Sequence, residues 1–270
     1  MSIYYAPKIT VTRLSLLIAS ALLTACASSP SSQPSLIPAE TVDITRKDGV
    51  FTQPLARKIT KPGCKGECPT LQMDSLVFPG NTALTQYVDQ QLAQMMRANE
   101  GDGTGADYST VDGFVNSYWK NAAARDEAQL YAKPRYRNKD LTVLELGVGY
   151  YATGAAHGTT RTQFVNWDNK AKKPLAFTEV VKSNQQATFN NRVQQAYMNW
   201  LKKQDLNEMD FNQYLRVWPF QPSENIALTD AGVVVKYNSY ELAPYSSGQP
   251  ELLITYPQLQ GILQPLFLPN

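Results

Sequence analysis

Histidine is almost missing from this chain of 270 residues, because His157 is the only one. A metal centre built from several histidines is therefore excluded. The sequence also lacks His-Glu-x-x-His, Gly-x-Ser-x-Gly, Gly-x-x-x-x-Gly-Lys and a Gly-x-Gly-x-x-Gly that follows a strand, which mark zinc proteases, serine hydrolases, and phosphate- and dinucleotide-binding enzymes. These absences favour a protein that is not an enzyme and that uses no metal or cofactor.

The chain has no excess of charge of either sign. It contains 25 basic and 23 acidic residues, and two of the basic ones, Lys8 and Arg13, precede residue 26. From residue 26 onward, 23 basic residues therefore balance 23 acidic ones. Without a net basic field or a dense Lys/Arg patch, we expect no nucleic-acid partner.

Residues 1–25 have the pattern of a signal peptide. A basic start precedes an apolar stretch at residues 14–23, which is too short for a membrane span, and small residues lead to Cys26. Leu23-Thr24-Ala25-Cys26 resembles the lipobox of bacterial lipoproteins, which implies lipidation of Cys26. Each buried methylene of an acyl chain contributes about 0.8 kcal/mol, so two or more chains form a stable membrane anchor. Ala27 occupies the position where Asp usually retains a lipoprotein at the inner membrane, so we expect an outer-membrane protein that faces the periplasm.

The three cysteines of the chain make an odd number for an exported protein. Assigning Cys26 to lipid leaves Cys64 and Cys68, which we expect to form a disulfide in an oxidising compartment. So short a loop gains only about 2 kcal/mol from chain entropy, so the bridge would mainly fix a turn. A redox dithiol and half of a zinc site are alternatives, but redox pairs are normally spaced by two residues and no second ligand cluster exists.

Composition divides the remaining chain into a tether and one domain. Residues 26–41 carry the lipidated cysteine and a flexible Ser/Pro-rich spacer, and residues 42–270 form a single domain of sufficient length for a core. Asp48-Gly49 predicts a turn between short strands at residues 42–44 and 50–51, and short strands are expected to continue toward residues 71–78. The glycine-rich residues 101–107 lack the ligand spacing of an EF-hand and predict a mobile connection rather than a calcium site.

The hydrophobic periodicity of the domain predicts alternating helices and hairpins. A helix begins after the N-cap Asn81, and a second contains Phe114 and Tyr118. A period of two between residues 127 and 167 predicts three antiparallel strands. A long helix follows at residues 184–203, opened by a capping box of Ser183 and Gln186, with a buried stripe of Phe189, Val193, Ala196, Tyr197, Trp200 and Leu201. Further strands at 226–228, 233–237 and 252–256 and a short helix at 257–263 complete an α+β fold of mostly antiparallel hairpins packed with two to three helices.

Two stretches carry a family resemblance. Residues 150–158, which end in Gly154-Ala155-Ala156-His157-Gly158, and residues 228–248, which contain Tyr240-Glu241-Leu242-Ala243-Pro244-Tyr245, resemble the extracellular domain of the RsiV family. The family usually has Gly-Gly-Ala-His where this chain has Gly-Ala-Ala-His. The family includes anti-sigma factors whose outer domain binds lysozyme, exported lipoproteins, and a domain appended to some cell-wall deacetylases. The resemblance implies lysozyme or peptidoglycan as a ligand, whereas the absence of a membrane-spanning helix and a sigma-binding segment argues against signalling through a sigma factor.

The same two stretches supply the candidate partner-binding residues: His157, Tyr240, Glu241, Pro244 and Tyr245. Tyrosines supply the rigid amphipathic area that anchors interfaces. His157 can alternatively be structural, with its ring pinning a turn through a backbone carbonyl and an amide. A cell-wall hydrolase or deacetylase would use His157 beside Ser246 or Ser247, or pair Glu241 with Asp230. A structural component of envelope assembly is a further alternative.

Overall fold

The computed structural model describes residues 52–100, 107–204 and 210–269. The signal peptide, Cys26, the spacer, the Asp48-Gly49 turn and nearly all of the glycine-rich connection lie outside the described residues. Within the described part of the chain, no helix combines the length and apolarity that a membrane crossing requires.

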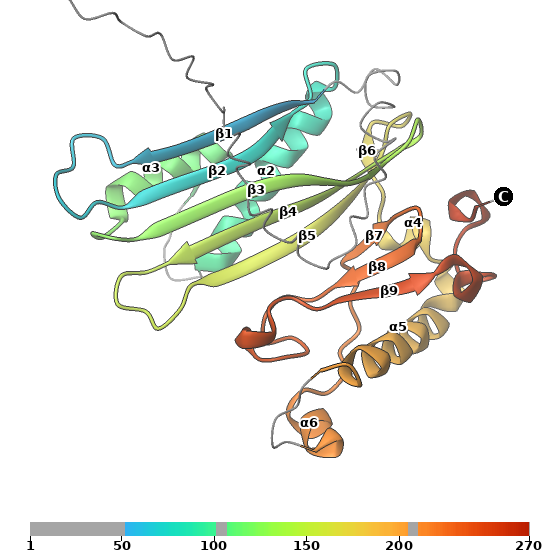
Figure 1. The fold of residues 1–270 in the computed structure, drawn as a ribbon. Coiled ribbons are helices and arrows are strands. Elements are labelled where there is room, and N and C mark those ends of the chain that lie inside the picture. The colour runs from blue at the N-terminus through green and yellow to red at the C-terminus, as the bar shows by residue number, and fades with distance from the viewer. Residues whose placement is uncertain (1–51, 101–106, 205–209, 270) are drawn as a thin grey trace, which may run out of the picture. The chain divides into compact units, whose positions relative to one another are not determined.

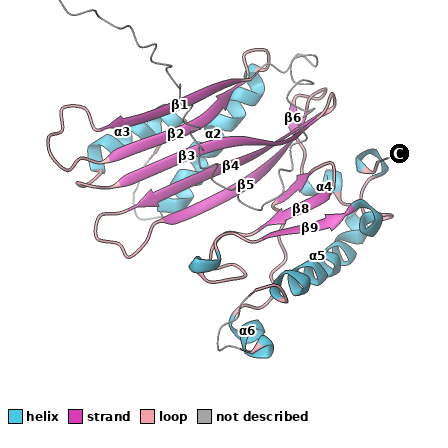
Figure 2. Ribbon diagram, in the orientation of Figure 1, coloured by secondary structure: helices cyan, strands magenta, loops and turns pink. Residues whose placement is uncertain are grey.

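The first half of the described chain forms a six-stranded sheet (Figures 1 and 2). Its strands lie in chain order: β1 (Gln53–Thr60), β2 (Thr70–Val77), β3 (Glu127–Arg137), β4 (Leu141–Tyr151), β5 (Thr159–Asp168) and β6 (Lys173–Pro174). All neighbouring pairs are antiparallel except β2 and β3. The three-stranded meander predicted between residues 127 and 167 is confirmed. The parallel pair was not expected, and it arises because α2 (Thr82–Glu100) and α3 (Val111–Asn121) form the crossover between β2 and β3.

These two helices cover one face of the six-stranded sheet (Figure 1). The predicted cap is present, since the side-chain oxygen of Asn81 accepts a hydrogen bond from the backbone N–H of Leu84 at 3.1 Å. The apolar face of α2, and Phe114 and Tyr118 of α3 as predicted, are buried or partly buried and pack against alternate residues of β2, β3 and β4. Leu71, Leu130, Leu144 and Leu146 are each almost completely buried there. One face of the sheet thus carries the first core.

The second half of the chain contributes a smaller antiparallel sheet, in the order β7 (Ile226–Leu228), β8 (Gly232–Lys236) and β9 (Glu251–Thr255). Its helices are α4 (Phe177–Val180), α5 (Gln186–Leu201) and α6 (Phe211–Val217), with 3-10 turns at Ser183–Gln185, Tyr245–Ser247, Tyr256–Leu259 and Pro265–Phe267. The predicted stripe of α5 faces a second core, in which Phe189, Val193, Tyr197 and Leu201 are buried and Ala196 and Trp200 partly so.

Several element predictions need correction. The long helix begins at Gln186, because Ser183 lies in the preceding 3-10 turn and its side chain caps nothing among the described residues. The helix predicted at 257–263 is a 3-10 turn that ends at Leu259; Gly261 then adopts a φ of +77° and Leu263 forms a bridge to Val181. The short strands expected before residue 78 are β1 and β2, of which β1 had been given no bounds, and helix α6 was not predicted.

Three asparagine side chains join the two sheets along the edge of β5. Asn166 on β5 donates to the carbonyl of Ile226 and accepts from the N–H of Leu228, each at 2.8 Å. Asn225 and Asn238 make the reverse contact, accepting from the backbone N–H groups of Phe164 and Thr162 respectively. The amides therefore satisfy strand-edge groups that would otherwise be left unpaired.

Candidate binding site

The structure brings His157 next to both tyrosines predicted with it, Tyr240 and Tyr245, although the histidine lies more than 80 residues before them in the chain. Nδ1 of His157 lies 2.9 Å from the carbonyl oxygen of Gly158, and Nε2 lies 2.9 Å from the hydroxyl of Tyr240. Because a carbonyl can only accept, Nδ1 donates the hydrogen bond to Gly158. The expected backbone carbonyl is thus present, whereas the second partner is a tyrosine rather than an amide.

Tyr245 completes this aromatic cluster, which we define as His157, Tyr240 and Tyr245. The rings of His157 and Tyr245 stack at 4.3 Å with an interplanar angle of 19°, and the two tyrosine rings lie 6.1 Å apart. Tyr240 is 51% exposed and Tyr245 37% exposed, so the cluster is a surface feature rather than part of a core. Rigid, exposed aromatic rings of this kind provide contact area at low entropic cost.

The backbone of Tyr240 is unusual, because its φ of +71° lies in the left-handed region that a bulky residue seldom adopts. The turn is held by hydrogen bonds from the N–H of Glu241 to Asn238 and from the N–H of Tyr240 to Ala243. A conformation of this type costs about 1–3 kcal/mol and persists only where the surroundings enforce it. Here it directs the hydroxyl of Tyr240 to His157.

Glu241 and Pro244 support the loop. The carboxylate of Glu241 accepts from the backbone N–H of Asn238 at 2.7 Å and from its side-chain amide at 3.0 Å. Pro244 precedes the 3-10 turn that carries Tyr245 and accepts a hydrogen bond from Ser247. Glu241 is exposed and therefore also remains accessible to a ligand.

A hollow of about 410 Å³ adjoins Tyr240 and is called the Trp218 hollow below. Its walls are Val217, Trp218, Pro219, Gln221, Pro222, Ser223, Tyr237, Tyr240 and Glu241. The rings of Trp218 and Tyr240 lie 6.3 Å apart at an interplanar angle of 30°. The 217–223 segment was not predicted as part of the site, and its sequence indicates a fixed, aromatic loop only through the Trp218-Pro219 and Gln221-Pro222 pairs.

Buried tyrosine hydroxyls fix the walls of this hollow. Tyr197 donates to the carbonyl of Trp218 at 2.7 Å and to that of Leu242 at 3.3 Å, which ties the two loops together. Tyr237 donates to the carbonyl of Gln221 at 2.7 Å. Burial raises the pKa of both tyrosines, so these hydroxyls stay protonated and keep donating across the physiological pH range.

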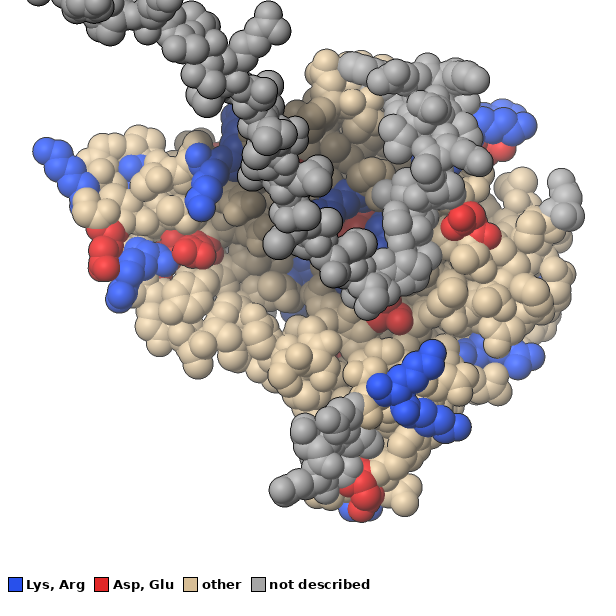
Figure 3. Space-filling model, in the orientation of Figure 1, with Lys and Arg blue, Asp and Glu red and all other residues tan. Residues whose placement is uncertain are grey.

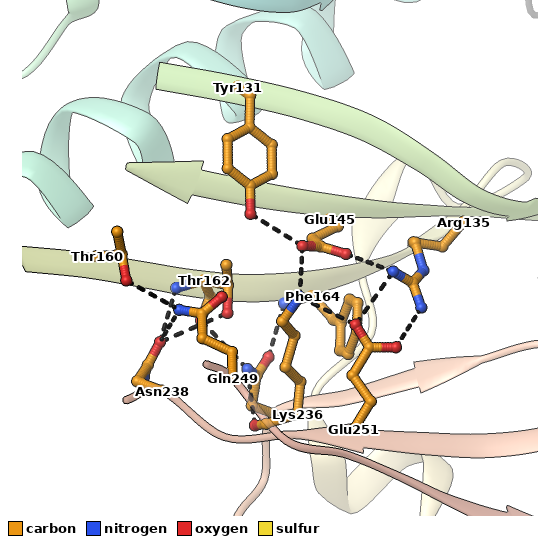
Figure 4. A network of polar contacts seen from close by, with 11 residues as sticks. Tyr131, Arg135, Glu145, Thr160, Thr162, Phe164, Lys236, Asn238, Gln249 and Glu251 are labelled. Carbon is orange, nitrogen blue, oxygen red and sulfur yellow. Dashed lines mark hydrogen bonds and ion pairs between the residues drawn. The ribbon is translucent and has the colours of Figure 1, made fainter. Parts of the chain in front are cut away.

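A group of four buried or partly buried charges joins the two sheets, as Figure 4 shows. Arg135 of β3 contacts Glu145 of β4 and Glu251 of β9, each at 2.6 Å, and Lys236 of β8 contacts the same two carboxylates at 2.7 and 2.9 Å. The hydroxyl of Tyr131 donates to Glu145 at 2.9 Å. The four charges balance and lie on both sheets, so they link the sheets without leaving a net buried charge.

Ionisation within this group, which we call the charge quartet, follows from its geometry. Burial acts to raise the pKa of Glu251, but the hydrogen bond from Arg135 and the charges of Lys236 and Arg135 lower it below its usual value. Burial, followed by the Glu145 carboxylate, raises the pKa of Tyr131. The sequence offered one signal for the quartet: Glu145 is the only charged residue within the buried strand segment 141–148.

The structure also locates the residues that a hydrolase would use. Among the described residues, no hydrogen bond joins His157 to Ser246 or Ser247. Asp230 lies in the turn before β8 and Glu241 in the connection after it, so the two carboxylates flank opposite ends of that strand. No group of three or more His, Cys, Asp or Glu side chains suited to a metal occurs in the described part of the chain.

A disulfide and a mixed distribution of charges are further features of the surface. Cys64 and Cys68 form a disulfide, as predicted, in the loop between β1 and β2. Lysine and arginine side chains are interspersed with acidic ones over the face in Figure 3 and do not gather into a basic patch.

Comparisons with known proteins place the chain in a family. Residues 177–257 match the model of DUF3298, described as a protein of unknown function. The chain is 31% identical to a DUF3298 family protein from Pseudomonas aeruginosa PAO1, whose crystal structure superposes with a TM-score of 0.73 over 82% of this chain and 97% of that one. A DUF3298 member from Bacteroides fragilis shares the fold at 18% identity, with a TM-score of 0.59 over 80% of this chain and 95% of that one. The comparison with curated proteins finds no match. On the identity and coverage of the Pseudomonas protein, this chain belongs to the DUF3298 family.

Proposed function

We propose that this DUF3298 protein is a lipoprotein of the outer membrane that binds a protein or cell-wall ligand in the periplasm without catalysing a reaction on it. Lipidation of Cys26 would hold the domain at the membrane, and the Ser/Pro-rich spacer would give it reach. Lysozyme is the first partner to test because the 150–158 and 228–248 stretches resemble the RsiV family.

The observation that carries the proposal is the exposed aromatic cluster. The sole histidine and two tyrosines converge from separate loops, and Tyr240 adopts a costly backbone conformation in doing so. A turn that needed only stability would be served by Gly or Asn at that φ. Displaying an aromatic ring at the surface accounts for a tyrosine there.

Calorimetric titration with several lysozymes and with soluble peptidoglycan fragments tests the proposal. We expect one of these ligands to bind and Tyr245→Ala to weaken that binding about 30-fold, the effect of losing an interface residue worth about 2 kcal/mol. Leu266→Ala is the matched control, because it removes a large apolar side chain that is 83% exposed on the C-terminal segment.

Two results would contradict the proposal at different points. If neither class of ligand binds, the assignment of the ligand is wrong. If a ligand binds and Tyr245→Ala behaves like Leu266→Ala, the aromatic cluster is not the binding surface. Release of reducing sugar or acetate from peptidoglycan by the protein, and its loss in His157→Ala, would instead establish the enzymatic alternative.

A further inference from the structure

The Trp218 hollow has a composition that selects a particular chemical group. Its wall contains one carboxylate, Glu241, and no basic side chain. Three aromatic residues, Trp218, Tyr237 and Tyr240, and two prolines line the hollow beside that carboxylate, and the rings of Trp218 and Tyr240 lie next to each other. A ligand that matches both features is a planar cation with an apolar stem.

We propose that the Trp218 hollow receives an arginine side chain of a protein partner. This inference rests on the proposed binding function and extends it by naming the group that the partner inserts next to the aromatic cluster. The guanidinium is planar, stacks on aromatic faces and forms forked hydrogen bonds to a carboxylate. A lysine ammonium can satisfy the carboxylate but lacks the flat face that fits against the rings.

The carboxylate of Glu241 is prepared for this contact. Its two oxygens each already accept one hydrogen bond from Asn238, at 2.7 and 3.0 Å, and each oxygen keeps a further lone pair. The side chain is therefore held in one orientation before the ligand arrives, which reduces the entropy lost on binding. The bonds from Tyr197 to the carbonyls of Trp218 and Leu242 likewise hold Trp218 and the residue that follows Glu241 in place.

The hollow also continues the aromatic cluster, since Tyr240 belongs to both. The hydroxyl of Tyr240 contacts His157, and the ring of Tyr240 lies beside the ring of Trp218. A partner that covers Tyr245 and Tyr240 would reach the hollow with a neighbouring side chain. This continuity favours a protein surface over an isolated small cation as the source of the guanidinium.

The test titrates the full chain with N-acetyl-arginine amide as the probe. Binding is followed through the NMR signal of the Trp218 indole N–H, which is assigned by its absence in Trp218→Phe. We expect this signal to shift as the arginine probe is added. N-acetyl-citrulline amide has the same shape without the charge, so it should bind at least about tenfold more weakly. Glu241→Gln should weaken binding of the arginine probe about tenfold, while the new side-chain oxygen can still accept a hydrogen bond from the backbone N–H of Asn238. Glu127→Gln, which removes an exposed carboxylate at the start of β3, should change nothing.

Equal binding of the citrulline and arginine probes would overturn the inference, as would a Trp218 signal that responds to a chito-oligosaccharide and not to arginine. The Tyr245→Ala variant separates this inference from the proposed function. An arginine response that survives in Tyr245→Ala while no lysozyme binds supports the hollow and leaves only the partner wrong. Lysozyme binding that is unchanged in Glu241→Gln, together with no arginine response, rejects the hollow and leaves the aromatic cluster standing.

Discussion

The charge quartet gives the sharpest stability prediction for this protein, through Lys236→Met. The ammonium of Lys236 lies 2.7 Å from Glu145 and 2.9 Å from Glu251, and its side chain is only 9% exposed. Methionine keeps the length and apolar volume of the stem, so the substitution removes charge with little loss of packing. It leaves two carboxylates sharing Arg135 as their only cation in the quartet.

The expected cost of Lys236→Met is about 3–5 kcal/mol of the free energy of unfolding, the usual result of leaving a buried charge uncompensated. That is a large share of the roughly 5–15 kcal/mol by which a domain is stable. Urea unfolding followed by circular dichroism measures it as a lower midpoint at an unchanged slope.

The double variant Lys236→Met/Glu145→Gln is the internal control, because it restores charge balance and keeps the Arg135–Glu251 pair at 2.6 Å. We expect it to be less destabilised than the sum of the two single variants by at least about 1 kcal/mol. A cost below about 1 kcal/mol for Lys236→Met, or strictly additive effects, would refute the view that the quartet acts as one balanced unit.

Three further predictions follow from the same structure and sequence. The pKa of Glu251 is lowered from 4.5 in the folded state, so the stability that this carboxylate contributes is present above about pH 4.5 and is lost as the pH falls through the folded value. When the free energy of unfolding is measured against pH in acid, Glu251→Gln should lose less stability than the unsubstituted protein. Identical pH profiles would contradict this. Gly232 has a φ of +149° and an added Cβ would lie 2.1 Å from the carbonyl oxygen of Ile254, so Gly232→Ala should cost about 3 kcal/mol. Gly149→Ala, whose Cβ would meet its nearest atoms at 3.7 Å, should have a far smaller effect in the same thermal-melting assay. Cys26→Ser should leave the precursor unprocessed or release the protein from membranes, and continued membrane attachment on fractionation would argue against lipidation.

Local patterns in the sequence were sufficient for most elements whose hydrophobic face is continuous. The helix after Asn81 and the three strands between 127 and 167 follow from periodicity and capping, because burial of one face repeats at 3.6 or 2 residues. Elements that lack such a face were missed or could be given no bounds. Strand β1 is almost fully exposed and pairs only as an edge, and α6 has seven residues, so neither leaves a periodic signal.

The parallel pairing of β2 with β3 also could not be read locally. Strand partners are chosen by long-range packing of α2 and α3 on the sheet, and the intervening residues look the same for either orientation. The start of α5 was misplaced for a related reason: Ser183 and Gln186 match a capping box in sequence, but the chain first forms a 3-10 turn.

The sequence by itself determined the class of fold, the disulfide between Cys64 and Cys68, and a short set of candidate binding residues that contains the only histidine. Only the tertiary structure decided which of those residues meet. His157 and Tyr240 come together because the β4–β5 loop and the β8–β9 connection lie at the same place once asparagine amides and the charge quartet join the two sheets. Contacts of this kind depend on where distant segments pack, which no local spacing of residues encodes.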